Sequence, residues 1–194
     1  MLEIKNLTVK VKNNAPILTD VSLSIDEGTC IGLTGASGSG KTTLIKSIMG
    51  MNGGDLEIPQ GQILLDGDNL LTHSAKERRM LCGETIGFIP QNPMTAFFPH
   101  AKMERQIIET LRMHTGLDKK QAHALAENVL RKVNLTDTKR VLSAYPGELS
   151  GGMLQRIAMA LILGTKPKYC LLYTSPFAFN KTVTFQQHIF IFFK

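Results

Sequence analysis

The sequence predicts an α/β fold with an antiparallel β part near the N-terminus and a helical insertion in the middle. Three observations predict it: period-two apolar patterns early in the chain, short apolar runs that end at glycine or proline, and longer patterns with helical spacing between them. With 194 residues, 43% hydrophobic and 20% charged, the chain has the composition of an ordinary globular protein of about one domain. These proportions argue against a disordered chain, a collagen-like repeat or a disulfide scaffold.

Short apolar patterns predict the strands. Apolar and polar residues alternate over residues 7–11 and again over residues 21–25, which is typical of half-buried antiparallel strands. Residues 30–34 form an apolar run before a glycine-rich stretch, so we expect a buried strand that leads into a loop. Residues 63–65 and 86–89 predict two further short strands, the first followed by an Asp-Gly-Asp turn and the second by a proline.

Helical spacing fills the region between about residues 92 and 148, which we expect to be an insertion between two β-containing parts. One apolar face recurs over residues 103–111 and a second over residues 122–133. Asp118 followed by Gln121 is typical of a capping box, which satisfies amide groups at a helix start. The sequence therefore predicts two amphipathic helices, the second beginning at Asp118.

The strongest local motif is GASGSGKT at residues 35–42, which matches G-x-x-x-x-G-K-[ST] and precedes a helical apolar pattern. Glycines let consecutive backbone amides turn toward phosphate oxygens and let the phosphate approach closely. Lys41 would contact the β and γ phosphates, Thr42 would offer its hydroxyl to Mg²⁺, and Thr43 would reach the α phosphate. The strand and helix context disfavours the alternative, a glycine-rich turn that binds nothing. The predicted nucleotide-binding residues of this phosphate loop are Gly35, Ser37, Gly38, Ser39, Gly40, Lys41, Thr42 and Thr43.

A second serine- and glycine-rich segment precedes another apolar pattern with helical spacing. It consists of Leu149, Ser150, Gly151, Gly152 and Met153. Its backbone amides and serine hydroxyl would lie at the positive end of a helix, which attracts phosphate. Taken alone, the segment is better explained by a plain serine N-cap followed by flexible glycines.

Together the two motifs resemble the phosphate loop and the LSGGQ signature of ATP-binding cassette (ABC) ATPases, with Met153 in the glutamine position. Gln91 lies between them, after a short apolar strand, where that family carries its Q-loop glutamine. The stretches QNPMTAFFP at residues 91–99 and YPGELSGGM at residues 145–153 are similar to the nickel, oligopeptide and dipeptide importer subfamily. The likeness covers about residues 1–172.

The resemblance implies a P-loop NTPase core and the role of an ATP-binding importer subunit for nickel or peptides, with ATP and Mg²⁺ as cofactors. Thr42 and Gln91 would serve the Mg²⁺ ion. Two subunits would pair head to tail, with ATP between the phosphate loop of one and the signature of the other. Transmembrane permease subunits would dock near residues 92–110, and a periplasmic or extracellular binding protein would act through them. The chain would then lie peripherally on the cytoplasmic face of the membrane.

The sequence departs from the family pattern where the catalytic carboxylates belong. Family members follow the signature helix with a strand that ends Asp-Glu-Pro, whereas here Thr174 and Ser175 precede Pro176, and no Asp or Glu follows Glu148. A hydroxyl does not replace the base that activates water. No catalytic residue is therefore identifiable, and we expect nucleotide binding without measurable hydrolysis.

Residues 173–194 hold six of the nine phenylalanines, and His188 does not fit the family's switch histidine. We expect an incomplete ABC ATPase domain over residues 1–172, followed by a tail that arose from a reading-frame shift, a chimeric assembly or a truncated gene. A genuine, shortened nucleotide binder is the alternative.

The family also stacks adenine on an aromatic residue where Val11 stands, so we expect weak base stacking.

Charge and cysteine content leave few other function classes. The net charge of +6 allows a polyanionic partner, but Lys and Arg are scattered, so we expect no nucleic acid partner. A non-hydrolysing nucleotide-binding module and an ABC-type ATPase acting on nucleic acid or ribosomes stay open as alternatives.

Three cysteines without a CxxC pair indicate neither a zinc site nor a disulfide framework. No segment approaches the roughly 18 apolar residues of a spanning helix, so we expect a cytosolic chain unless a partner anchors it.

Overall fold

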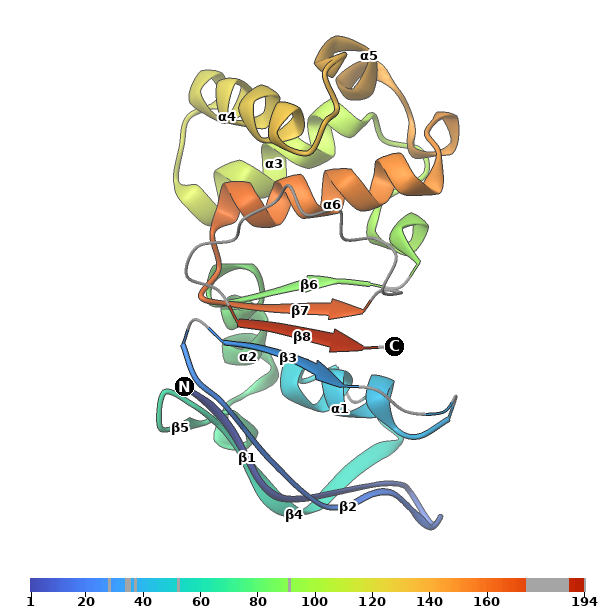
Figure 1. Ribbon diagram of the computed structural model, residues 1–194, viewed down its shortest axis with the longest axis vertical. Helices are drawn as coiled ribbons and strands as arrows, with labels where there is room; N and C mark the ends of the chain where they lie inside the picture. Colours follow the sequence, from blue (N-terminus) through green and yellow to red (C-terminus); the bar gives the residue numbers. More distant parts are fainter. Residues whose placement is uncertain are drawn as a thin grey trace.

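The arrangement of layers separates the two glycine-rich motifs. In the computed structural model, an antiparallel sheet packs on helix α1 (Lys41–Met49), α1 packs on a parallel sheet, and the far side of that sheet carries helix α6 (Gly151–Thr165) and further helices (Figure 1). The structure describes residues 1–27, 29–33, 36, 38–51, 53–90, 92–173 and 189–193.

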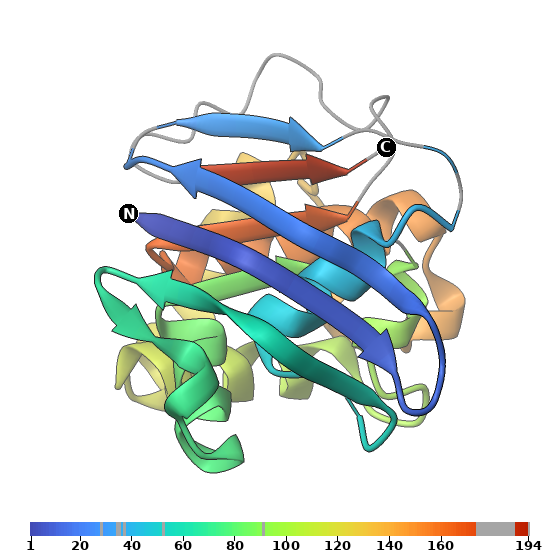
Figure 2. The same cartoon turned by 90° about the horizontal axis from the view of Figure 1, so that it is seen from below.

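The antiparallel sheet confirms the two period-two patterns. Its strands are β1 (Leu2–Val11), β2 (Pro16–Ile25), β4 (Leu56–Leu65) and β5 (Asp68–Asn69), in the order β2-β1-β4-β5. Strand β4 is longer than the predicted residues 63–65. Its Pro59 lies where the register against β1 shifts, between the pairs Thr8↔Gln60 and Lys10↔Glu57, so the missing proline N–H breaks no regular pair. Figure 2 shows β1, β2 and β4 crossing over α1.

The parallel sheet contains the strand predicted just before the phosphate loop, at residues 30–34, and the strand predicted just before the helical insertion, at residues 86–89. Its members are β3 (Cys30–Leu33), β6 (Ile86–Ile89), β7 (Tyr169–Tyr173) and β8 (Ile189–Phe193), in the order β3-β8-β7-β6. Strand β8 pairs with β3 on one side and with β7 on the other. Residues 189–193, which the sequence pattern assigned to a tail outside the family domain, thus lie inside the sheet.

Among the described residues, the other helices are α2 (Ala75–Glu84), α3 (Met103–Thr115), α4 (Lys119–Lys132) and α5 (Thr138–Ser143). The same residues include the single turns η1 (Leu70–Thr72), η2 (Pro93–Ala96) and η3 (Pro146–Glu148). The predicted capping box of α4 is confirmed: Asp118 accepts from the Gln121 amide at 2.8 Å, and the Gln121 side chain accepts from the Asp118 amide at 3.1 Å. Side chains of the helix start thus satisfy two amides that no carbonyl of the helix can reach.

Two hydrophobic clusters occupy the two sides of the parallel sheet. Tyr169 and Leu171 of β7 belong to the cluster that contains α1 and the antiparallel sheet, whereas Cys170 belongs to the cluster that contains α3, α4 and α6. This alternation follows from the period of two along a strand. Both faces of the sheet are covered, as parallel sheets require. Within the described ranges, no helix has the length and apolar character needed to cross a bilayer.

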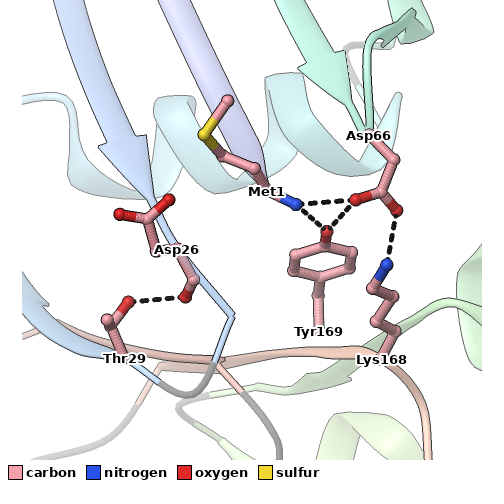
Figure 3. A network of polar contacts seen from close by, with 6 residues as sticks. All are labelled: Met1, Asp26, Thr29, Asp66, Lys168 and Tyr169. Atoms are coloured by element: carbon pink, nitrogen blue, oxygen red, sulfur yellow. Dashed lines mark hydrogen bonds and ion pairs between the residues drawn. The ribbon is translucent and has the colours of Figure 1, made fainter.

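A polar network ties the antiparallel sheet to the amino end of β7 (Figure 3). Asp66, in the turn after β4, accepts from the Met1 ammonium at 2.6 Å, from the Tyr169 hydroxyl at 2.8 Å and from Lys168 Nζ at 3.0 Å. The Met1 ammonium also donates to the Tyr169 oxygen at 2.8 Å. These contacts fix the relative position of the two sheets at the end of the molecule opposite the phosphate loop.

Candidate nucleotide-binding site

The described part of the phosphate loop, residue 36 and residues 38–42, leads directly into α1. Gly40 is the N-cap of the helix and has φ 83° and ψ 3°, and Gly38 has φ 82°. Both conformations are left-handed, which glycine adopts without strain. The Gly40 carbonyl accepts from the Leu44 amide at 2.9 Å, which begins the helical ladder. Gly35 and Ser37 lie outside the described residues.

Gly40 also lies too close to strand β2 to carry a side chain. A Cβ at this position would lie 2.5 Å from Leu18 Cδ2 and 3.3 Å from both the Cγ2 and the carbonyl oxygen of Ile17. The loop therefore rests on β2, and the antiparallel sheet helps to set the position of the α1 N-terminus.

Lys41 folds over the loop. Its side chain is buried, and Nζ donates to the Ala36 carbonyl at 2.7 Å and to the Ser39 hydroxyl at 3.1 Å. The ammonium is thus held at the loop, within reach of any phosphate bound there. No acidic residue occupies the first turn of α1, so the positive end of the helix dipole is not neutralised by a carboxylate of that turn.

The two threonines differ in exposure. Thr42 is exposed, whereas Thr43 is half-buried and its carbonyl accepts from the Ser47 hydroxyl at 2.9 Å. Among the residues that the structure describes, no three His, Cys, Asp or Glu side chains gather into a metal site. The Mg²⁺ ligands that the sequence predicts are neutral oxygens, those of Thr42 and Gln91; with nucleotide phosphates and water they would form a set that suits the ion.

The LSGGM segment begins α6 as the sequence predicts. Ser150 is the N-cap, and its hydroxyl accepts from the Met153 amide at 3.3 Å. Leu149 is buried at 7% exposure in the helical cluster, and Met153 packs partly against the same cluster. Gly151 and Gly152 are exposed, and a Cβ added to either would have no atom of another described segment within 4 Å. The segment therefore presents an open serine and glycine surface.

Arg156 holds this first turn of α6 in place. Its Nε donates to the Gly152 carbonyl at 3.3 Å, and its Nη1 donates to the Asn134 carbonyl after α4 at 3.2 Å. The sequence predicted no role for Arg156, since helical spacing alone does not show which carbonyls its guanidinium reaches.

The structure does not bring the two motifs of one chain together. The phosphate loop opens on the α1 side of the parallel sheet, and the LSGGM segment begins α6 on the other side, although both lie at the same end of the molecule (Figure 1). Gln91, the predicted site residue that belongs to neither motif, lies outside the described residues. The next residue along the chain, Asn92, caps η2 by accepting from the Met94 amide at 3.1 Å.

A cavity of about 540 Å³ lies at the start of α3. Its walls combine basic, acidic and apolar side chains and include His100, Lys102, Arg105, Ile108, Arg112 and Tyr145. Gln106 holds the loop at its edge: the Gln106 oxygen accepts from the Phe98 amide at 2.8 Å, and its Nε2 donates to the carbonyls of Phe98 at 3.0 Å and Ala101 at 2.7 Å. Phe98 itself is 76% exposed at the surface beside this loop.

Comparison with known proteins places these features in one family, because the sequence matches the ABC transporter family over residues 18–172. The chain belongs to this family. Among curated relatives, the metal-staphylopine import system ATP-binding protein CntD of Staphylococcus aureus is 36% identical over 169 residues, which cover 87% of this chain and 62% of the relative. The oligopeptide transport ATP-binding protein OppD of Haemophilus influenzae is 32% identical over 189 residues, covering 96% of this chain and 58% of the relative.

The dipeptide transport ATP-binding protein DppD of Lactococcus lactis is 35% identical, covering 87% of this chain and 49% of the relative. This ABC family chain thus spans less than two thirds of the length of these relatives. Among solved structures, a dimeric ATP-binding cassette bound to ADP and phosphate in a post-hydrolysis state has a TM-score of 0.81 at 21% identity, over 100% of this chain and 88% of the other. This likeness confirms the predicted ABC ATPase fold.

Proposed function

We propose that the chain is the ATP-binding subunit of an ABC importer, and that its phosphate loop binds MgATP. The observation that carries the proposal is the contact of Lys41 with Ala36 and Ser39 at the N-terminus of α1. This contact holds an ammonium beside two left-handed glycines, Gly38 and Gly40, at a helix end that attracts phosphate. Lys41 would exchange its contacts with the loop for contacts with the β and γ phosphates.

In the proposed assembly, a second copy or a related subunit supplies the other half of the site. The open surface of Gly151 and Gly152 supports this, because a Cβ added to either meets no other segment among the described residues within 4 Å, and the surface lies across the parallel sheet from the phosphate loop. Ser150 and the amides that follow it would contact the ATP of the partner subunit. Leu149 and Met153 would anchor the segment by packing in the helical cluster.

The cavity at the start of α3 is the proposed contact for transmembrane permease subunits. Most of its lining residues fall within the predicted docking region of residues 92–110. Tyr145, which lines it, is 42% exposed, and Phe98, in the loop before α3, is 76% exposed. Aromatic side chains open to solvent beside a concave surface are typical of protein contacts. Such docking would place the subunit on the cytoplasmic face of the membrane, with a periplasmic or extracellular binding protein acting through the permease.

Nickel, another chelated metal or a peptide is the proposed cargo, because CntD, OppD and DppD carry metal-staphylopine and peptide names. Nucleic acid is not among the proposed partners. The missing carboxylates favour one alternative: since no Asp or Glu follows Glu148, these 194 residues would act as a nucleotide-binding module without turnover.

Titration of the full chain with MgATP tests the proposal. Lys41→Ala should abolish most binding, whereas the control Lys46→Ala, in the last turn of α1, should bind normally because Lys46 is exposed at the far end of the helix. Equal binding by both variants would overturn the assignment of the site. Phosphate release from MgATP should equal the rate without protein, and release that depends on Lys41 would show that another group replaces the missing base.

A further inference from the structure

The first turn of α6 is built from weak helix formers. Two adjacent glycines, Gly151 and Gly152, occupy its first two positions, and glycine loses more conformational freedom in a helix than any other residue. The Ser150 hydroxyl caps the turn by accepting from the Met153 amide at 3.3 Å, which is longer than most N–H···O hydrogen bonds. The glycine turn, residues 150–153, therefore has little stability of its own.

Arg156 joins this glycine turn to helix α4. Its Nε donates to the Gly152 carbonyl at 3.3 Å, and its Nη1 donates to the Asn134 carbonyl at 3.2 Å. Asn134 precedes Arg156 by 22 residues and follows the end of α4. Because the guanidinium is planar and rigid, its two donors fix the distance and direction between the two carbonyls.

The Asn134 end of this bridge is itself held in place. Asn134 has φ 60°, and its amide donates to the Arg131 carbonyl at 3.0 Å. The amide of the next residue, Leu135, donates to the Leu130 carbonyl at 3.0 Å, and both leucines are buried in the helical cluster. The Asn134 carbonyl is thus a fixed acceptor, and Arg156 fixes the glycine turn relative to it.

We propose that Arg156 is a positioning residue for the ATP of the partner subunit. Its guanidinium holds the glycine turn in the conformation in which the Ser150 hydroxyl and the amides that follow it contact phosphate. The proposal rests on the proposed pairing of two subunits around ATP and deepens it. A turn that is ordered before the ligand arrives loses less conformational entropy on binding, so Arg156 strengthens the association without touching ATP.

Amide hydrogen exchange of the full chain tests whether Arg156 orders the turn. The Leu154 amide donates to the Ser150 carbonyl at 3.0 Å and reports on the start of α6, whereas the Lys166 amide donates to the Ile162 carbonyl at 2.9 Å and reports on its end. Arg156→Ala should speed exchange at Leu154 about tenfold or more and leave Lys166 unchanged. Unchanged exchange at Leu154 would overturn the proposal.

Dimerisation with MgATP, followed by light scattering, tests the consequence of this order. Arg156→Ala should raise the dissociation constant of the dimer about tenfold or more. The affinity of the single chain for MgATP, titrated well below that dissociation constant, should stay within about twofold of the parent, because Lys41 belongs to the other motif. An equal loss of both affinities would indicate a general effect on folding and would contradict a positioning role.

Arg156→Lys separates the two donors from the charge. Lysine keeps the positive charge but lacks the planar pair of donors, so this variant should recover only part of the dimerisation that Arg156→Ala loses. Full recovery would show that the charge alone suffices and would overturn the positioning role.

Arg131→Ala is the matched control, because it removes the same charge from an exposed side chain of α4 that pairs with Glu127 at 3.3 Å. It should dimerise and exchange as the parent does, and a loss equal to that of Arg156→Ala would count against the proposal. Failure of the parent itself to dimerise with MgATP would overturn the proposed pairing of subunits and the role in binding ATP with it. Exchange at Leu154 would then still show whether Arg156 orders the turn.

Discussion

The hydroxyl of Tyr169 donates to the carboxylate of Asp66 at 2.8 Å, and this hydrogen bond joins the parallel sheet to the antiparallel sheet. The two residues are 103 positions apart in the chain. The ring of Tyr169 is buried at 1% exposure, whereas the Asp66 side chain is 41% exposed and also accepts from Lys168. A buried ring with a polar tip thus aligns the two sheets on which the phosphate loop depends.

Removal of that hydroxyl should cost stability without disturbing the core. Tyr169→Phe keeps the ring and its packing but removes two hydrogen bonds to partly exposed charged groups, the Asp66 carboxylate and the Met1 ammonium. We therefore expect the free energy of unfolding to fall by about 1–2 kcal/mol. Tyr145→Phe is the control, because Tyr145 is 42% exposed and should change stability by less than about 0.5 kcal/mol. Urea denaturation of both variants measures the difference, and equal stabilities would show that the Asp66 contact does not hold the sheets together.

Acid should weaken the contacts of Asp66 that join the two sheets. The Met1 ammonium, as the strongest influence, together with Lys168 and Tyr169, holds the pKa of the Asp66 carboxyl well below its usual range. A carboxyl with a lowered pKa in the folded state contributes stability above its unfolded pKa of about 3.9 and loses it as the pH falls further. The unfolding free energy should therefore decrease below about pH 4 more steeply in the parent than in Asp66→Asn. Parallel curves for the two proteins between pH 6 and pH 3 would contradict this.

Substitutions at two glycines of the phosphate loop should show how much stability is lost to backbone strain alone and how much to a steric clash. Gly38 and Gly40 have nearly the same φ, 82° and 83°, but only a Cβ at Gly40 meets Leu18. Gly38→Ala should cost about 1 kcal/mol for the left-handed backbone. Gly40→Ala should cost about 2–4 kcal/mol, because the clash with β2 adds to that strain. Thermal unfolding measures both, and equal losses would show that β2 yields to the added methyl group.

A large side chain at the start of α6 should prevent two subunits from dimerising and should leave folding intact. The Cβ of Gly151→Leu would meet no other segment within 4 Å in the part of the chain that the structure describes, and leucine favours a helix more than glycine does, so the variant should fold at least as well as the parent. We expect it to lose ATP-dependent dimerisation, measured by light scattering during gel filtration. Gly147→Leu, in η3 and equally unobstructed, is the control and should still dimerise. Dimerisation by both variants would place the subunit contact elsewhere.

The conformation of the loop before α3, residues 98–101, should depend on the side chain of Gln106. Gln106 makes all three of its hydrogen bonds to the backbone of residues 98–101, so Gln106→Ala should speed amide exchange at Phe98 about tenfold or more. Gln106→Glu keeps the acceptor for the Phe98 amide but loses the donor, and it should give an intermediate rate. Asn128→Ala, on α4, is the control. Unchanged exchange in Gln106→Ala would mean that the turn at residues 98–101 is held by its own backbone.

Residue patterns predicted most of the elements that frame the site. The glycine spacing of the phosphate loop indicated the helix that starts at Lys41, and Asp118 with Gln121 indicated the start of α4. Helix α2 was not predicted, because its sequence AKERRMLCGE has no continuous apolar face and its backbone leaves the helical region at Cys82 and Gly83. The available signal was local: Ser74 and Glu77 form a capping box, with contacts of 3.3 and 2.7 Å.

Contacts between residues far apart in the sequence could not be predicted from such residue patterns. Nothing in the spacing of β2 indicates that Ile17 and Leu18 touch Gly40, or that Asp66 meets Tyr169, because these pairs depend on how the sheets stack. Strand β4 was predicted too short because Pro59 interrupts its pattern, and the structure tolerates the proline by placing it at a register shift. The nucleotide-binding and metal-binding roles assigned to all the site residues stay predictions, and Gly35, Ser37 and Gln91 also lie outside the described ranges.

The place of β8 between β3 and β7 determines when the parallel sheet can form during synthesis. A ribosome makes β3 about 160 residues before β8, yet β3 has no other strand as its neighbour in the described sheet. The nascent chain therefore carries an unpaired β3 edge until residues 189–193 have left the exit tunnel. For that interval the strand leading to the phosphate loop has unpaired backbone groups that can pair with other chains.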